Sequence, residues 1–88
     1  EFFMNEFEFV VTDPQGIHAR PAGVLVKEAK KFESNISVFK GARKGNLKKI
    51  FTVMALGVKQ GETIKVQVEG ADEEQAASTV EAFLKENF

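Results

Sequence analysis

A histidine and an arginine two positions apart, His18 and Arg20, are the residues of this chain best suited to chemistry. His18 is the only histidine of the sequence. It lies between a turn that contains proline and glycine and a helical pattern, so we expect its imidazole at or just before a helix N-terminus. Unpaired N–H groups at a helix start stabilise anions and disfavour a protonated imidazole. We therefore expect a neutral, nucleophilic histidine beside an anion site.

The residues around His18 favour a phosphate as that anion. Arg20 carries a planar fork of donors that matches phosphate oxygens. Ala19 and Pro21 complete the expected helix start, where the preset φ of proline is compatible with a helix and no N–H bond is lost. Such a setting suits a histidine that accepts and releases a phosphoryl group. On these residues alone, a plain surface histidine beside a helix cap remains an equal alternative.

The sequence lacks the residues that several other classes of functional site require. With one histidine and no cysteine, the chain cannot assemble a zinc site of the usual kind, and we expect neither a metal nor a cofactor. There is no Walker loop and no dinucleotide fingerprint. A Ser-His-Asp hydrolase would need the nucleophile-elbow motif, which is missing. A phosphate donor would therefore have to come from another molecule.

Charge is unevenly distributed along the chain. The formal net charge is −1, yet the stretch from Ile36 to Gly61 has six basic residues and no acidic one. Such a stretch is usually a solvated face, although beside His18 it would steer an acidic protein or a phosphate. It also raises the alternative of a small nucleic-acid-binding domain using Lys40 to Lys49. The negative net charge and the absence of Tyr and Trp for base stacking argue against that alternative, and we expect no nucleic-acid partner.

The length of 88 residues predicts one domain with a single core. Residues 1–3, Glu-Phe-Phe, precede a methionine and are interpreted as a cloning remnant, which leaves a single domain over residues 4–88. The absence of cysteine fits a reducing compartment. No apolar run approaches the 18 or so residues of a membrane span, so we expect no membrane insertion. We also expect the protein to be cytoplasmic and monomeric.

Hydrophobic periodicity predicts seven elements. Strands alternate apolar and polar residues, whereas helices repeat apolar residues every three to four positions. The expected elements are a strand with Phe7, Phe9 and Val11 on its buried face, a helix from Ala19 to Phe32, strands from Ile36 to Phe39 and Arg43 to Leu47, a short helix from Lys48 to Gly57, a strand from Thr63 to Glu69, and a last helix burying Ala76, Ala77, Val80, Phe83 and Leu84. Gly45 weakens the third strand, and Asp72 with Gln75 has the form of a helix capping box.

This βαββαβα order predicts an α+β fold, an open-faced β-sandwich. Four strands would form an antiparallel sheet covered on one face by three helices. The short helix has apolar residues all round it, so we expect part of Ile50, Phe51 and Met54 to be exposed. Gly23 either weakens the first helix or lets a partner approach close to His18.

The chain resembles the HPr family, the histidine-containing phosphocarriers of the bacterial phosphoenolpyruvate:sugar phosphotransferase system. The resemblance covers nearly the whole chain from Met4 and agrees with the fold expected above. Its motifs are the segment Asp13-Pro14-Gln15-Gly16-Ile17-His18-Ala19-Arg20-Pro21-Ala22, then Asn46-Leu47-Lys48 with Ile50, Val53-Met54-Ala55-Leu56-Gly57, and Glu69-Gly70-Ala71-Asp72-Glu73-Glu74.

The resemblance implies a phosphoryl relay. Enzyme I, charged by phosphoenolpyruvate, would phosphorylate Nδ1 of His18, and the carrier would pass the group to sugar-specific IIA components. Arg20 matches the arginine that steadies the phosphate, and Pro21 the proline that follows it. The chain would act as a stoichiometric intermediate and not as an independent enzyme. A paralogous carrier in a regulatory, nitrogen-related relay would use His18 and Arg20 in the same way and remains the main alternative.

The resemblance also implies a docking surface and shows one departure. Gly23, Ile50, Phe51 and Met54 align with the residues that contact partners. Where many family members from Gram-positive bacteria carry a regulatory serine, this chain has Lys49. We therefore predict no regulatory serine phosphorylation at this position, and we do not expect Thr52, in the short apolar helix, to replace it.

Overall fold

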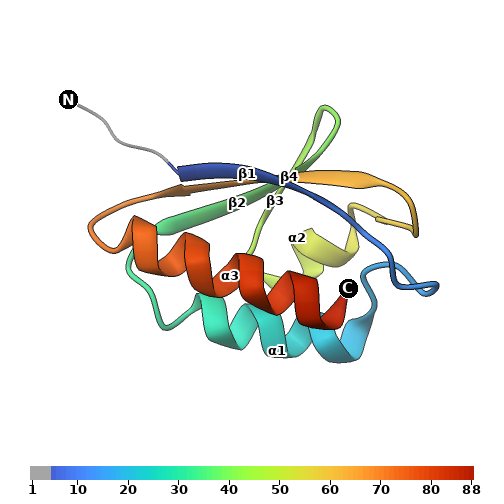
Figure 1. Cartoon of the computed structure of the whole chain (residues 1–88), viewed down its shortest axis with the longest axis horizontal. Helices are drawn as coiled ribbons and strands as arrows, with labels where there is room; N and C mark the ends of the chain where they lie inside the picture. Colours follow the sequence, from blue (N-terminus) through green and yellow to red (C-terminus); the bar gives the residue numbers. More distant parts are fainter. Residues whose placement is uncertain (1–4) are drawn as a thin grey trace.

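The structure, a computed structural model that describes residues 5–88, has the predicted element order. A sheet forms one layer and three helices form the other, as Figure 1 shows. The elements are β1 (Asn5–Val10), α1 (Ala19–Ala29), β2 (Asn35–Lys40), β3 (Arg43–Asn46), α2 (Ile50–Met54), β4 (Thr63–Glu69) and α3 (Glu73–Asn87). The proposed remnant at residues 1–3 and the domain start at Met4 lie outside the described residues, so that boundary stays a prediction.

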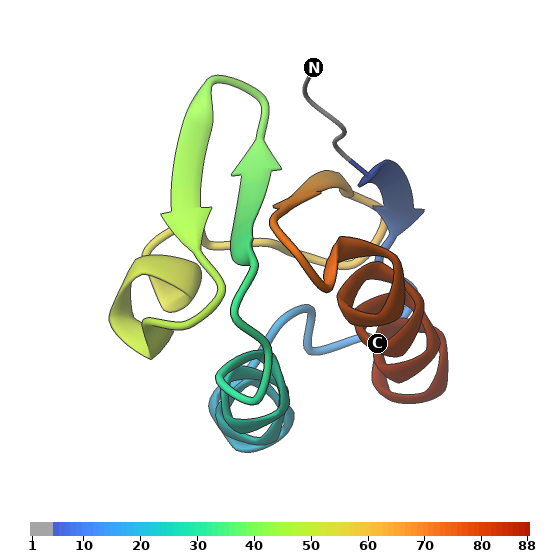
Figure 2. The ribbon, with the colours of Figure 1, turned by 90° about the vertical axis from the view of Figure 1, so that its left-hand side faces the viewer.

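The sheet confirms the predicted α+β open-faced sandwich. Its strand order is β1-β4-β2-β3, and each neighbouring pair is antiparallel. In the end-on view of Figure 2, α1 and α3 lie on the same side of the sheet, with α2 beneath β3. Central strand β4 alternates buried Ile64, Val66 and Val68 with more exposed residues, because successive side chains point to opposite faces. One face of the sheet therefore contributes to the core and the other is left uncovered.

The core lies between this sheet face and the helices. The apolar stripes of α1 and α3 reach it every three to four residues, as the periodicity predicts. Its largest fully buried side chains include Leu25, Ile36, Ile64 and Leu84. Phe83, expected among them, is only partly buried and packs against the edge of the core.

Elements β1, α1 and α2 are each shorter in the structure than the periodic pattern predicts. β1 ends at Val10, and Phe7 and Phe9 are only half-buried because β1 is an edge strand with a neighbour on one side. α1 ends at Ala29, where the amide of Phe32 bonds the carbonyl of Ala29 in a tighter turn. α2 has five residues, because Lys49 has extended backbone angles and caps the helix start. Gly57, with a φ of 61°, closes the turn after α2 as expected.

The predicted capping box at the start of α3 is wrong. Asp72 is the N-cap residue, but its side chain makes no bond to the first turn of α3. Its carboxylate instead accepts hydrogen bonds from the backbone amides of Glu33 and Ser34 and from the Ser34 hydroxyl. These donors belong to the loop between α1 and β2, so the carboxylate joins two connections that are far apart in sequence.

Gly45, which made the third strand a weak prediction, lies where β3 and α2 pack closely together. It is buried in β3, and a Cβ atom placed there would lie 2.9 Å from the carbonyl oxygen of Thr52 in α2. The absence of a side chain therefore allows α2 to pack directly on the edge strand. Within residues 5–88, no helix has the length and apolar character needed to cross a membrane.

Candidate functional site

His18 occupies the N-cap position of α1, as predicted. Its backbone is extended, with φ −120° and ψ 166°, and its carbonyl oxygen accepts the first helical bond, from the amide of Ala22. Its side chain is 32% exposed and makes no capping bond to the helix. The imidazole therefore stands at the positive end of α1, where another molecule can reach it.

The next three residues build an anion-binding helix start. The backbone N–H groups of Ala19 and Arg20 come first in α1 and have no intrahelical acceptor, while Pro21 has no N–H to leave unpaired. The first turn contains no acidic residue. Arg20 is exposed, and within residues 5–88 its guanidinium forms no ion pair. Its donors are thus available to an anion held at the helix start.

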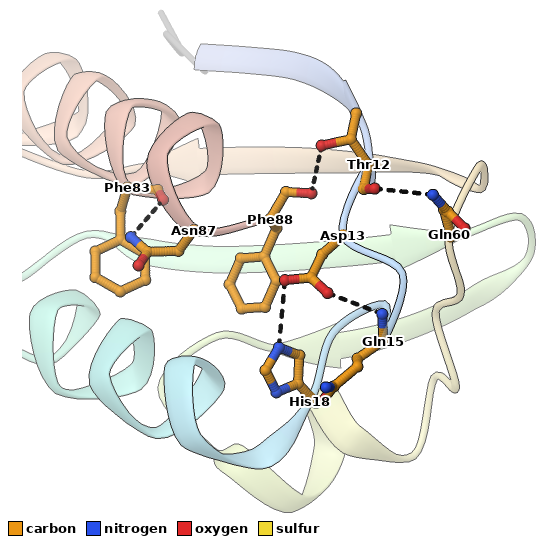
Figure 3. A network of polar contacts seen from close by, with 8 residues as sticks. All are labelled: Thr12, Asp13, Gln15, His18, Gln60, Phe83, Asn87 and Phe88. Atoms are coloured by element: carbon orange, nitrogen blue, oxygen red, sulfur yellow. Dashed lines mark hydrogen bonds and ion pairs between the residues drawn. The ribbon is translucent and has the colours of Figure 1, made fainter.

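Two further residues contact the imidazole, and the sequence analysis assigned neither of them a role. Figure 3 shows the Asp13 carboxylate and the Phe88 ring next to each other, both facing the imidazole of His18. The Nε2 atom of His18 lies 3.4 Å from Oδ2 of Asp13. The ring of Phe88 meets the imidazole edge-on, with centroids 6.0 Å apart and an interplanar angle of 78°. Asp13 was accessible to sequence reasoning as a carboxylate in the turn before His18, whereas Phe88 is 70 positions away and carries no local signal.

The turn before His18 is fastened to the loop between α2 and β4. The amide of Ile17 donates to the carbonyl of Val58 at 3.1 Å, and the amide of Gly61 donates to Val11 at 2.7 Å. Gly16 has a φ of 67°, and a Cβ atom there would collide with the Val58 carbonyl. Only glycine fits at this point without displacing the backbone that leads to His18.

An ion pair holds the loop between α2 and β4 in place. Lys40, at the end of β2, pairs with Glu62 at 3.1 Å and also donates to the carbonyl of Gly57 at 3.0 Å. Glu62 accepts the amide of Lys59 at 2.7 Å. The Lys59 amide, followed by the Lys40 ammonium group, lowers the pKa of Glu62 below its ordinary value of 4.5. One lysine of the basic stretch is therefore used to secure the loop behind the site.

The proposed docking residues lie together on α1 and α2. Phe51 is 85% exposed, whereas Ile50 and Met54 are half-buried and pack against the core, which confirms that this helix leaves apolar surface uncovered. A Cβ atom at Gly23 would lie 3.7 Å from Cδ1 of Ile50, an ordinary contact. Gly23 of α1 thus adjoins Ile50 of α2. These two residues, with Phe51 and Met54 of α2, are here called the α1–α2 surface.

Lys49 and Thr52 occupy the first part of α2. Lys49 is exposed at the N-cap, the position that the resemblance assigns to a regulatory serine in other family members. The Thr52 hydroxyl is half-buried and engaged, since it contacts the carbonyls of Lys49 and Asn46 at 2.7 and 2.9 Å and accepts the Asn46 amide at 2.9 Å. That Thr52 does not replace the regulatory serine stays a prediction.

Comparison with known proteins agrees with this arrangement. A family profile described as the PTS HPr component phosphorylation site matches residues 5–86. The chain belongs to the HPr family. The phosphocarrier protein HPr of Mycoplasma capricolum is 47% identical over 77 residues, which span 88% of this chain and 86% of that protein. HPr of Mycoplasma genitalium is 42% identical over 85 residues, 96% of this chain and 97% of that protein.

Solved structures of HPr proteins share the fold. The histidine-containing phosphocarrier protein of a mycoplasma superposes with a TM-score of 0.87 at 44% identity and covers 90% of both chains. An HPr structure from Thermoanaerobacter tengcongensis gives a TM-score of 0.87 at 40% identity, over 92% of this chain and 91% of that one. Family membership favours a phosphocarrier over the nucleic-acid-binding alternative.

Proposed function

We propose that this HPr-family chain carries a phosphoryl group on His18, accepts it from phosphorylated Enzyme I and passes it to sugar-specific IIA proteins. The observation that carries the proposal is the position of His18: a partly exposed imidazole at the N-cap of α1, inside the segment matched by the family profile. The protein would do this in the cytoplasm, where its phosphorylated donor is formed.

The chemistry expected at this position is nucleophilic. A neutral imidazole offers one ring nitrogen with a free lone pair, which attacks phosphorus while the bond to the donor breaks. The N–H groups of Ala19 and Arg20 and the guanidinium of Arg20 would bind the phosphoryl oxygens. This electrostatic support is needed in both directions, because the same group must later leave for an acceptor.

An open surface suits such a carrier better than a pocket. The chain has to bind donor and acceptor in turn and release both, so each contact should be small and transient. The exposed Phe51, with half-buried Ile50 and Met54 beside it, supplies a limited apolar area next to the helix that begins at His18. We propose this α1–α2 surface as the docking site for both partners.

The experiment measures intact mass after incubation with phosphoenolpyruvate, Mg²⁺ and purified Enzyme I. We expect a gain of one phosphate that is lost in mild acid, as a phosphohistidine would be, and its transfer on addition of a IIA protein. The matched variant His18→Ala should fold and gain no mass. A wild-type protein that stays unphosphorylated, or a His18→Ala variant that is still phosphorylated, would overturn the proposal.

A further inference from the structure

We propose that Asp13 is a positioning residue for His18. Its carboxylate holds the imidazole with the proton on Nε2, so that Nδ1 presents its lone pair to the phosphoryl group. This inference rests on the proposed function, because it names the residue that prepares the same histidine for transfer.

The first argument is the placement of the Asp13 carboxylate. Oδ1 accepts the amide of Gln15 at 2.8 Å, and the backbone amide of Asp13 donates to the main-chain oxygen of Phe88 at 2.7 Å. The carbonyl of Asp13 accepts the amide of Gly16 at 2.8 Å. With the backbone and one carboxylate oxygen held, Oδ2 is left facing Nε2 of His18 at 3.4 Å. Figure 3 shows the two contacts of the Asp13 carboxylate, with Gln15 and with His18.

The second argument concerns which ring nitrogen can face a carboxylate. An ionised carboxylate only accepts hydrogen bonds, so the nitrogen next to it must carry the proton. A neutral imidazole has one N–H group, and its proton on Nε2 leaves Nδ1 with a free lone pair. The Phe88 ring lies against the imidazole in a T-shaped arrangement and is a second neighbour of the ring. The contact with the Asp13 carboxylate thus selects one tautomer.

The third argument is the charge that develops during transfer. The Nδ1 lone pair forms the N–P bond while the bond from phosphorus to the phosphorylated protein donor breaks, its electron pair leaving with the donor. The ring then carries a positive charge and keeps its Nε2 proton. Asp13 faces that proton, so its negative charge stabilises the cationic ring. When an acceptor attacks phosphorus, the N–P electrons return to Nδ1 and no proton moves at Nε2.

The test uses two substitutions of Asp13. They separate its contact with the His18 imidazole from its hydrogen bond to the Gln15 amide in the preceding turn. Asp13→Asn keeps an oxygen for the Gln15 amide and turns its NH₂ group toward Nε2, which then has to accept. We expect the proton to move to Nδ1 in this variant. Asp13→Ser also keeps an acceptor for Gln15, as serine does in such turns, but its hydroxyl is too short to reach His18. Thr12→Val removes a neighbouring side-chain bond to Phe88 and serves as the matched control.

Two measurements are made on each protein. The ¹⁵N chemical shifts of the ring nitrogens, recorded at about pH 8.5 where an ordinary imidazole is neutral, report the tautomer without any partner. Rapid-quench kinetics with phosphorylated Enzyme I report the rate of acceptance. We expect the wild type and Thr12→Val to hold the Nε2–H tautomer. Asp13→Asn should shift to Nδ1–H and Asp13→Ser to a mixture, and both should accept about 10- to 100-fold more slowly.

The outcomes distinguish the two proposals. If the wild type takes up no phosphate, the proposed function fails, while the ring shifts still report on Asp13. If the wild type is phosphorylated but Asp13→Asn keeps its tautomer or its rate, the function stands and the inference is overturned. Urea unfolding of each variant verifies that the rates belong to folded protein.

Discussion

The amide nitrogen of Ile17 lies 3.1 Å from the carbonyl oxygen of Val58, so the residue directly before His18 is bonded to a loop 41 positions further on. This bond requires a close approach of two backbones at Gly16. The approach of the loop therefore sets the direction in which the chain enters α1, and with it the place of the imidazole.

The substitution Gly16→Ala should disturb both stability and transfer. The positive φ and the collision with Val58 predict a loss of about 1–3 kcal/mol in the free energy of unfolding and a slower phosphorylation of His18. Gly41→Ala is the control, because Gly41 also has a positive φ, 59°, but its added Cβ would meet no atom within 4 Å. Urea unfolding that gives equal losses for the two variants would contradict the role of the loop contact.

The substitution Arg20→Ala should slow phosphoryl transfer by about 100-fold and leave the fold intact. The guanidinium is exposed, so its removal costs the folded chain little packing, whereas the phosphate loses two aligned donors. Rapid-quench kinetics measure the transfer rate, and urea unfolding measures the stability of the fold. Arg20→Lys keeps the positive charge but not the fork of donors, so its transfer rate should lie between those of the wild type and Arg20→Ala. An unchanged rate, or an unfolded Arg20→Ala protein, would count against this role.

Phe51→Ala should weaken the binding of Enzyme I about tenfold while changing the free energy of unfolding by less than about 0.5 kcal/mol. The side chain is 85% exposed, so it adds little to the fold. Val10→Ala removes another exposed apolar group, 51% exposed, from β1 and is the control. Ile50→Asp and Met54→Asp would also weaken docking, but both residues pack against the core and would lose stability too. Calorimetric titration showing equal affinities for Phe51→Ala and wild type would exclude Phe51 from the interface.

Asp72 should make stability depend on pH in the acid range. The Ser34 hydroxyl and then the Glu33 amide lower the pKa of Asp72 below its ordinary value of 3.8. The folded state thus binds fewer protons than the unfolded chain. This contribution is complete above about pH 5 and is lost as the pH falls past 3.8 toward the folded pKa.

The variants Asp72→Asn and Ser34→Ala test this dependence. In urea unfolding between pH 3 and 7, each should lower the midpoint at pH 7 and flatten the decline toward pH 3. Part of the decline should persist because the pKa of Glu62 is lowered as well. A decline as steep in Asp72→Asn as in the wild type would show that other groups cause it.

The parts of the site that sequence could predict depend on signals within a few residues. His18 lies at the start of α1 because a Pro- and Gly-containing turn is followed by helical periodicity, and both signals are local. The exposure of Phe51 follows in the same way, since a short helix with apolar residues on every side cannot bury them all. The order of the elements and the α+β class rest on the same kind of evidence.

The local signals failed where a distant group competed for the same side chain. Asp72 and Gln75 have the spacing of a capping box, yet the amides of Glu33 and Ser34 and the Ser34 hydroxyl take up the Asp72 carboxylate. No spacing within α3 reports that these donors will be near. The exact ends of α1 and α2 were missed for a related reason, because tight turns and caps depend on the path of the following loop.

The sequence by itself determined that His18 and Arg20 share a helix start and that seven elements follow in βαββαβα order. These features depend on residue types and on periods of two or three to four residues, which a chain shows before it folds. Only the tertiary structure decided that Asp13 and Phe88 contact the imidazole and that Val58 anchors the turn before it. Such contacts join residues up to 70 positions apart, and they form because packing the helices on one sheet face brings the end of α3 beside the turn before α1.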